Sequence, residues 1–349
     1  MEPITHLMTG ACLARSGFNR KAAYATAVMT IAAEAPDLDT LWSIDGPIAS
    51  FQHHRGWTHT LIGIPFEAAI LVGAFYLYHR WRTRSNSPAK PPRAPISWPL
   101  LYLFALIAFL SHILLDWTNN YGIRPFFPFN PHWYAGSFVF IFEPVLFLIL
   151  LTALVAPSLF GLINAEVGAN KPAFRGQNWA IFGLLATLAL WSLRYIEHDK
   201  ALTLAQAADY GGAPVSRVFA SPAPINPFRW YTIAETPQFF QLSTTNTRDN
   251  AVATNPQSDI VYKPPTTLGT LVAKRSWLGE VYLDWSQWPV VTDIGADADG
   301  LTTVTFRDLR FLSNMPLLPK QKSAPLSGAV VLNPDRRILH MDFDGRTQH

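Results

Sequence analysis

Long apolar runs fill the first two hundred residues of the chain, whereas the remainder alternates polar, aromatic and proline-rich stretches. A helix that crosses a bilayer needs about 20 apolar residues. Three runs reach this length, and a fourth is slightly shorter but is flanked by Trp and Tyr residues, which favour the membrane interface. The four predicted spans are Leu61–Trp81, Pro99–Trp117, Phe138–Phe160 and Trp179–Ile196.

Two shorter segments rich in Ala, Gly and Thr precede these spans. They are Ile4–Gly17 and Ala22–Ala35, and the basic residues Arg20 and Lys21 lie between them. Small side chains allow close helix packing. We therefore expect a helical hairpin buried against the spans, with its basic tip in the cytoplasm.

The chain after Ile196 has the pattern of an amphipathic helix, at Glu197–Gly212, and then of strands. Alternating, aromatic-rich stretches separated by Pro, Gly and Asn are typical of strands and turns. The predicted strands lie in 229–236, 239–245, 259–263, 280–296, 301–311, 327–333 and 336–343. The predicted fold is thus an α-helical membrane domain (a helical hairpin plus about four transmembrane helices) in residues 1–197. A small β-rich extracytoplasmic domain follows in residues 198–349.

Basic residues predict the orientation. The connection 78–95 carries five Arg or Lys and no acid, which is typical of a cytoplasmic loop. Lys171 and Arg175 fall on the same side after two further crossings. By alternation, everything after Ile196 lies outside. The sequence therefore predicts a multi-pass protein of the bacterial cytoplasmic (inner) membrane with an extracytoplasmic C-terminal domain.

Composition narrows the classes of partner. Charged residues make up 15% of the chain, well below the roughly 25% of soluble domains. The net charge of +3 is small and dispersed, which gives no argument for nucleic acid. The single cysteine, Cys12, rules out intramolecular disulfides. We expect membrane lipid and a small-molecule or lipid substrate as partners.

Polar residues interrupt the apolar pattern at one end of each segment, and by the alternation above this is always the outer end. His112 and Asp116 are four residues apart near the end of one span, so both project from the same face of the helix. In "HHRGWTH", Gly56 suits a bend that brings His54 and His59 to one point. The candidate ligands at these ends are His6, Asp37, Asp39, His54, His59, His112, Asp116 and Glu143.

This set of imidazoles and carboxylates predicts a metal site. Mixed nitrogen and oxygen ligands suit Zn²⁺ first, with Mn²⁺ or Fe²⁺ as alternatives, because Mg²⁺ and Ca²⁺ want more oxygen. The ligands exceed what one closed site needs, so the prediction is one to three ions. Each residue also has a simpler interpretation: a lone histidine at a span end more often hydrogen-bonds at the interface, and Asp116 can cap its helix. Their shared membrane face argues against independent accidents.

Several motifs together resemble the YdjM-like family over about residues 1–200, and more loosely beyond. They are His6, "PDLD", "HRGWTH" before an apolar span, "SHILLDWTNNYGIRPFFPF" and "IFEP". Members of that family are LexA-regulated, inner-membrane-associated and classed as metal-dependent hydrolases, with a distant similarity to zinc-dependent phospholipase C. The resemblance implies metal ligation by His6, Asp37, Asp39, His54, His59, His112 and Asp116. Where the family has aspartate in "IDP", this chain has Glu143.

Two functions remain open at this point. The first is a membrane-bound metal-dependent hydrolase acting on a phosphoester or lipid-like substrate at the outer face of the cytoplasmic membrane. Asp37 or Asp39 is then the general base, and Arg55 holds an anionic group. The second is a non-catalytic membrane protein with a structural metal site and a partner-binding β domain. An open coordination position separates the two. Transport is a weaker third reading, because no internal repeat stands out.

Overall fold

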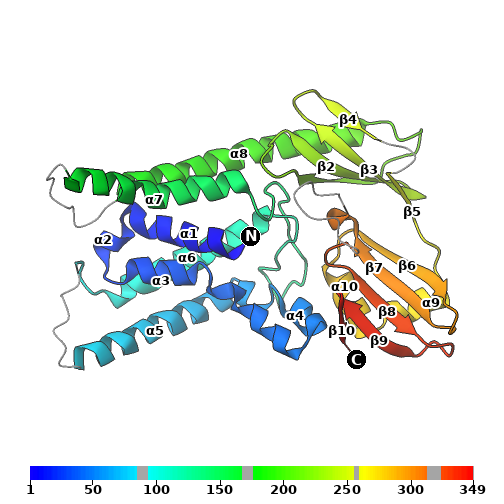
Figure 1. Ribbon diagram of the computed structural model, residues 1–349, viewed down its shortest axis with the longest axis horizontal. Coiled ribbons are helices and arrows are strands. Elements are labelled where there is room, and N and C mark those ends of the chain that lie inside the picture. Colours follow the sequence, from blue (N-terminus) through cyan, green and yellow to red (C-terminus); the bar gives the residue numbers. More distant parts are fainter. Residues whose placement is uncertain (85–92, 167–175, 255–258, 313–323, 349) are drawn as a thin grey trace. The chain divides into compact units, whose positions relative to one another are not determined.

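The computed structural model describes residues 1–84, 93–166, 176–254, 259–312 and 324–348 (Figure 1). The chain forms two compact units. The first comprises Met1–Asp39, Arg55–Glu197 and Pro222–Pro227. The second comprises Thr40–His54, His198–Ser221 and Phe228–His349. The chain passes between the units at several points, one of them after Glu197, and the short segment Thr40–His54 groups with the C-terminal part. The division at residue 197 into a membrane domain and a soluble domain stays a prediction.

The N-terminal hairpin is formed by α1 (Pro3–Leu13), a π-helical turn with the short α2 (Asn19–Lys21), and α3 (Ala25–Ala32). The two arms approach closely at Gly10, where an added Cβ would lie 2.4 Å from the carbonyl oxygen of Met29. Small residues permit this approach. Both arms end inside the first unit beside the longer helices.

Four long helices make up the rest of the first unit: α5 (Gly63–Arg84), α6 (Trp98–Thr118), α7 (Pro144–Glu166) and α8 (Gln177–Ala207). Among the described residues, three helices are long and apolar enough to cross a membrane. A fourth candidate span is α5 together with the short helices before it, which meet it at an 82° bend. The prediction of about four spans agrees with this range.

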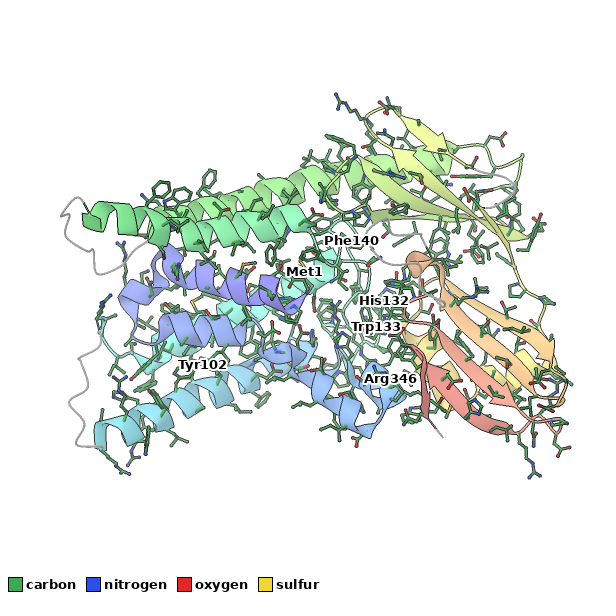
Figure 2. The ribbon with its side chains drawn as sticks, viewed as in Figure 1. Met1, Tyr102, His132, Trp133, Phe140 and Arg346 are labelled. Atoms are coloured by element: carbon green, nitrogen blue, oxygen red, sulfur yellow. The ribbon has the colours of Figure 1, made fainter. Side chains whose placement is uncertain are left out.

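Helix α6 contacts both α3 and α5, and its buried residues Leu101, Phe104 and Phe109 belong to the main apolar core. The hydroxyl of Tyr102 donates to the carbonyl oxygen of Pro65 on α5 (Figure 2). Because α6 lies in this core, the two polar residues near its C-terminal end are also enclosed by protein. The helix therefore positions them rigidly.

Two helix boundaries differ from the sequence prediction. Helix α7 begins at Pro144, so 138–143 is not helical. Helix α8 runs without a break through Glu197 to Ala207, so the separately predicted amphipathic helix is the end of the last span. Neither Pro nor Gly occurs between Trp191 and Ala207, so nothing in the chain stops the helix there.

The second unit contains two five-stranded sheets, whose registered pairs are all antiparallel. The first has the order β1-β2-β3-β4, with β5 also paired to β3; its strands are Arg217–Pro222, Arg229–Glu235, Phe239–Asn246, Ala251–Ala253 and Ile260–Tyr262. The second has the order β10-β9-β8-β7-β6; in chain order, β6 to β10 are Pro289–Ala296, Thr302–Asp308, Gly328–Leu332, Ile338–Phe343 and Arg346–Gln348. The C-terminal part is therefore β-rich, as predicted.

Three short helices accompany the second sheet: α4 (Pro47–His53), α9 (Leu268–Lys274) and α10 (Trp277–Trp285). The ring of Phe51 on α4 stacks on Phe343 of β9 at 4.2 Å. The sequence interpretation of 280–296 as one strand is wrong for its first part, which belongs to α10. Ser276 caps that helix by accepting from the Gly279 N–H.

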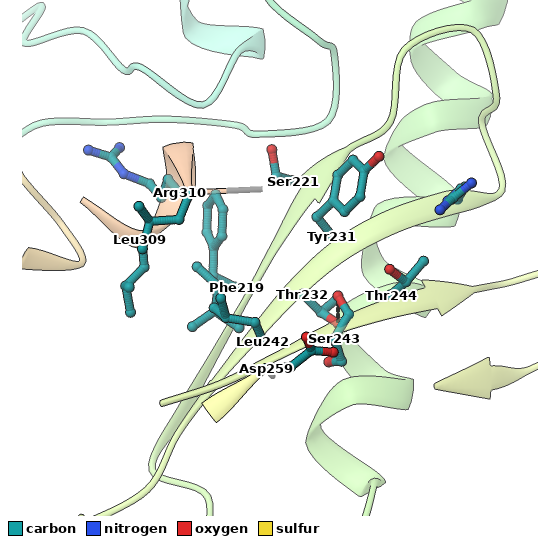
Figure 3. Close-up of a pocket in the computed structure, with 13 residues that line it drawn as sticks. Phe219, Ser221, Tyr231, Thr232, Leu242, Ser243, Thr244, Asp259, Leu309 and Arg310 are labelled. Atoms are coloured by element: carbon teal, nitrogen blue, oxygen red, sulfur yellow. Dashed lines mark hydrogen bonds between the residues drawn. The ribbon is translucent and has the colours of Figure 1, made fainter. Parts of the chain in front are cut away.

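A cavity of about 370 Å³ lies in the second unit (Figure 3). Aromatic and hydroxyl side chains from the first sheet line it, among them Phe219, Tyr231 and Ser243, together with Asp259 and Arg310. Arg310 is already engaged by Asp308, whose Oδ2 lies 2.8 Å from its guanidinium. Among the described residues that line the cavity, no other group indicates a catalytic or metal-binding site.

Candidate metal centre

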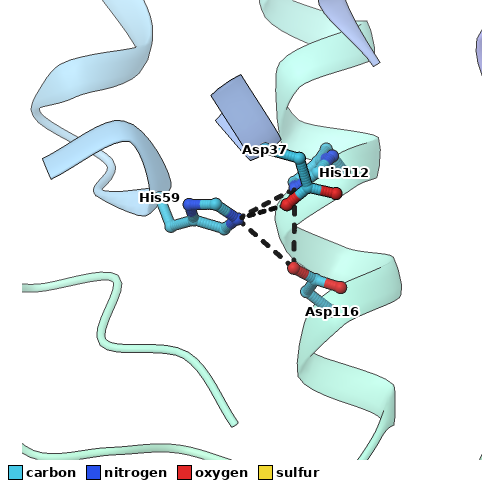
Figure 4. Close-up of side chains that lie close together, drawn as sticks. All are labelled: Asp37, His59, His112 and Asp116. Carbon is cyan, nitrogen blue, oxygen red and sulfur yellow. Dashed lines mark hydrogen bonds and ion pairs between the residues drawn. The ribbon is translucent and has the colours of Figure 1, made fainter. Parts of the chain in front are cut away.

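Four side chains from three segments of the first unit converge on one point (Figure 4). Asp37, His59, His112 and Asp116 each offer one ligand atom, and these atoms lie within 4.8 Å of one another. The side chains of His59, His112 and Asp116 are fully buried, whereas Asp37 keeps 13% of its side chain exposed. This group is called the metal centre below.

Local structure explains how each residue arrives. His112 and Asp116 lie one turn apart on α6 and so share a face. Asp37 lies on the 3₁₀ segment Ala35–Asp45, which starts where α3 ends. His59 ends the 3₁₀ turn Trp57–His59, just before α5. The bend next to α5 is what turns the His59 ring inwards.

The distances from the carboxylate oxygens to the imidazole nitrogens suit a tetrahedral ion, while the two carboxylate oxygens lie within 4.8 Å of each other. The two imidazole Nε2 atoms are 3.0 Å apart. The Oδ1 of Asp37 and the Oδ2 of Asp116 each lie 3.4 to 3.6 Å from both nitrogens. Metal bonds of about 2.0–2.2 Å, as for zinc with nitrogen and oxygen, give tetrahedral edges of roughly 3.3–3.6 Å. The residues present therefore fit a divalent cation.

The protons on the two histidines support the same conclusion. His112 Nδ1 lies 2.8 Å from the carbonyl oxygen of Ala33, which accepts only, so the proton is on Nδ1. His59 Nδ1 lies 3.4 Å from the carboxylate of Asp39 and 3.1 Å from the hydroxyl of Thr58. With its proton on Nδ1, His112 presents the Nε2 lone pair to the centre. His59 Nε2 lies 3.4 Å from both Asp37 and Asp116, so in the metal-free protein it holds a proton that a bound ion would displace. Such outer partners are typical of metal-binding histidines.

The carboxylates face the same point as anions. The Oδ2 of Asp116 has no hydrogen-bond donor among the described residues. Burial raises the pKa of Asp37, but the hydrogen bond from His59 and the nearby His112 outweigh burial and hold that pKa below its ordinary range. Two carboxylate oxygens and two imidazole nitrogens that face one another need a shared proton, as on His59, or a metal ion between them. That arrangement is the main evidence for a metal site.

The other carboxylate oxygen of Asp116, Oδ1, also has partners. This oxygen accepts from the Arg55 guanidinium at 2.8 Å and lies 3.3 Å from His6 Nε2, with the Met1 amino group in contact. His6 stacks on His112, with ring centroids 3.9 Å apart. Burial and the neighbouring Met1 ammonium lower the pKa of His6 to about 3, so the ring is neutral. His6 therefore lies against the centre but outside the group of four.

Arg55 is buried and donates in several directions. One amino nitrogen bonds Asp116, and the other donates to the side-chain oxygen of Asn119 and to the carbonyl oxygen of Gly122. Its guanidinium also lies over the Tyr121 ring, 4.7 Å from the centroid. The backbone N–H of Arg55 donates to Asp39 at 2.7 Å. These contacts tie Arg55 to the protein around the centre.

Two predicted ligands lie elsewhere. Glu143 pairs with Arg194 of α8 at 2.5 Å and accepts from the Ile225 N–H. His54 belongs to the second unit, at the C-terminal end of α4. Among the described residues, the structure thus brings four of the eight predicted ligands together. It places Asp39 and His6 directly beside them.

Sequence reasoning missed Glu34, which follows α3 by two residues. Its Oε2 is buried without a hydrogen-bond partner among the described residues. Burial first and the charge of Asp37 second raise the pKa of Glu34 to about 8. The available signal was a single acid in the otherwise apolar stretch before "PDLD".

Comparison with known proteins gives the family. A family model described as "YdjM inner membrane protein" matches residues 1–201. The chain belongs to this family. The match covers most of the helical part, including every residue of the metal centre, so the chain is an inner membrane protein with several helices long and apolar enough to cross the bilayer.

One curated relative adds little about activity. "Uncharacterized protein YfhP" of Bacillus subtilis (strain 168) is 27% identical over 162 residues. The match covers 44% of this chain and 45% of the relative, so the chain spans less than half of that protein's length. No solved structure matches the YdjM chain at a significant level.

Proposed function

We propose that this YdjM protein is a membrane-bound metal-dependent hydrolase that acts on a phosphoester or lipid-like substrate at the outer face of the cytoplasmic membrane. The observation that carries the proposal is the convergence of two imidazole nitrogens and two carboxylate oxygens within 4.8 Å of one another, with each carboxylate oxygen 3.4 to 3.6 Å from both nitrogens. Asp37, His59, His112 and Asp116 would hold the ion. Zinc fits first, and manganese or iron are the alternatives.

A bound divalent ion supplies a water of lowered pKa and polarises the ester under attack. The chain's own residues provide the rest. His112 and Asp116 are fixed by α6, Asp39 orients His59, and Arg55 orients Asp116. Asp37 is the exposed member of the group, so substrate approaches from its side.

The orientation follows from the charges at the helix ends. Arg80, Arg82 and Arg84 lie at the end of α5 remote from His59. An excess of basic residues marks the cytoplasmic side, so the metal centre faces outwards. Lys171 and Arg175, which carry the same prediction, lie outside the described residues. A site at the outer lipid–water boundary supports a lipid-linked phosphoester as the substrate class.

The test is a paired measurement of metal content and phosphodiesterase activity in purified wild type and His112→Ala. We expect wild type to retain zinc and cleave a phosphodiester, and His112→Ala to lose both. Ser111→Ala is the matched control, because that hydroxyl only donates to the Ala108 carbonyl oxygen on the same helix. Full metal content and unchanged hydrolysis in His112→Ala would refute the proposal.

A second candidate function rests on the number of ligands. Four protein ligands can close a tetrahedral sphere, which is typical of structural zinc sites. The chain would then be a non-catalytic membrane protein with a partner-binding β-rich part. Cobalt substitution separates the two: in the hydrolase, inorganic phosphate changes the visible spectrum of the Co²⁺ form, whereas a closed structural site leaves it unchanged.

A further inference from the structure

An aromatic hairpin, residues Asn119–Val139, leaves the end of α6 next to the metal centre. Its two arms are joined by paired backbone hydrogen bonds between Ile123 and Tyr134, at 2.7 and 2.9 Å. Inside it, the Arg124 guanidinium lies over the rings of Phe127 and Trp133, 4.9 and 4.8 Å from their centroids. The hairpin is therefore an ordered element rather than a loose connection.

The tip of this hairpin is apolar and exposed. Phe129 is 83% exposed and Phe126 is 48% exposed. Fully burying a Phe side chain is worth about 1.5–3 kcal/mol, so a packed element that presents two of them to water is unfavourable. Exposed apolar groups of this kind mark an interaction surface.

The apolar surface continues from the tip into a predicted span. The Leu61 N–H donates to the carbonyl oxygen of Pro125 at 2.9 Å. Leu61 and Ile62 are both exposed and lead directly into α5. On α5 the exposed side continues with Phe66 and Ile70, which belong to the membrane-facing surface. The tip is thus an extension of the lipid-contacting face.

Charge is consistent with a lipid headgroup layer. The hairpin contains one formal cation, Arg124, and no Asp or Glu. Aromatic side chains concentrate at membrane–water boundaries, and a surface without carboxylates is not repelled by anionic headgroups. Trp57, 56% exposed, packs edge-on against Phe127 at 5.2 Å and adds a further interfacial ring.

We infer that the tip of the aromatic hairpin, with Phe126, Phe129 and Trp57, is inserted in the lipid–water interface of the outer leaflet. It is a membrane anchor additional to the spans. It also fixes the depth of the metal centre, because Arg55 donates to Gly122 at the hairpin base and Trp57 is two residues from His59. The inference does not depend on hydrolase activity.

Depth-dependent fluorescence quenching tests this directly. Phe129→Cys carries an environment-sensitive fluorophore and is placed in nanodiscs of phosphatidylcholine and phosphatidylglycerol. The native Cys12 is buried and does not compete for the label. We expect quenching by doxyl lipids labelled near the headgroup, and a quenching constant for aqueous iodide roughly tenfold below that of a solvent-exposed site.

Two exposed apolar positions calibrate the result. Ile294→Cys on β6 is 67% exposed and should respond to iodide and not to doxyl lipid. Ile70→Cys on α5 is 73% exposed and should respond best to a doxyl group deep in the acyl chain. A Phe129 label that behaves like either control overturns the inference, and Phe126→Cys must give the same interfacial depth.

Discussion

At the scale of single residues, the metal centre depends on partners that face away from it. His112 donates to the Ala33 carbonyl oxygen, and His59 faces Asp39. These contacts choose which ring nitrogen is free to bind, and ligands oriented in this way bind metal more tightly. Asp39 would therefore act on a bound ion through His59.

Asp39→Asn tests that role. The amide can still accept from the His59 ring but has lost the negative charge that makes the imidazole more basic. We expect zinc affinity to fall about 10–100-fold, measured by competition with a chromophoric chelator. Asp45→Asn is the matched control, because it makes the same change at an exposed position of the same 3₁₀ segment. Equal affinities for wild type and Asp39→Asn would contradict the prediction.

The sequence could indicate only part of this centre. The four-residue spacing of His112 and Asp116 placed them on one helix face, and the structure has them together. The Ala33 carbonyl oxygen carries no signal, because every residue has a carbonyl. Glu143 looked like a ligand because its partner, Arg194, is far away in the chain. Pairings over such distances are decided by tertiary packing.

At the scale of elements, the centre depends on how closely α1 and α3 pack. A Cβ on Gly10 would lie 2.4 Å from the carbonyl oxygen of Met29 and 2.7 Å from the Cβ of Ala33. Ala33 also supplies the carbonyl that orients His112. A side chain at Gly10 should therefore displace the backbone after α3, and with it the Ala33 carbonyl oxygen that orients His112. Metal binding at the centre should weaken as a result.

Gly10→Ala is expected to reduce stability by about 1–3 kcal/mol through overpacking and to weaken zinc binding as well. Gly73→Ala is the matched control, because a Cβ there meets nothing within 4 Å on α5. Thermal unfolding in detergent and a zinc titration measure both effects. Gly10→Ala with the stability of wild type would show that the helices can separate without cost.

A second element-scale prediction concerns the end of β7. Asp308 is buried and accepts from Arg310, from the Ser286 hydroxyl and from the Gln287 N–H. Burial raises the pKa of Asp308, but Arg310 and these hydrogen bonds outweigh burial and lower it below 3.8. Asp308→Asn leaves a buried guanidinium uncompensated and should cost about 3 kcal/mol. Arg307→Gln, on the same strand but exposed, should change little.

The sign of the pH dependence follows from the lowered pKa. In the unfolded chain the carboxyl titrates near 3.8, so above that pH the folded state keeps the whole benefit of the charged form. The benefit is lost only as the pH falls through the lower, folded-state pKa. The stability difference between wild type and Asp308→Asn should be constant from pH 5 to 7, on the order of the figure above. It should shrink in stronger acid. A difference that grows in acid would contradict the assignment.

Elements with a clear local sequence pattern could be predicted, whereas elements determined by tertiary packing could not. The apolar runs gave α5 and α6 within a few residues because the membrane demands continuous apolarity. The stretch 280–285 contains Val281, Tyr282 and Trp285, residue types that are common in strands, yet the Ser276 cap and the contacts of α10 with α4 favour a helix. Propensity is a weak guide where packing decides.

At the scale of the whole molecule, the distribution of basic residues predicts how the chain is oriented in the membrane. The family is an inner membrane family, and the basic end of α5 predicts which end of the helices faces the cytoplasm. An extracytoplasmic C-terminal part is a prediction that rests on that orientation and on the single helix α8, which continues into the second unit. One reversal of orientation would move the metal centre and the β-rich part together.

Cysteine labelling in intact spheroplasts tests this orientation. A membrane-impermeant maleimide should label Ile294→Cys, which is exposed on β6, without permeabilisation. Arg84→Cys, exposed at the basic end of α5, should react only after the membrane is opened. Because Cys12 is buried, wild type supplies the unlabelled background. Labelling of Arg84→Cys alone in intact cells would place the metal centre in the cytoplasm and remove the argument for an outer-leaflet substrate.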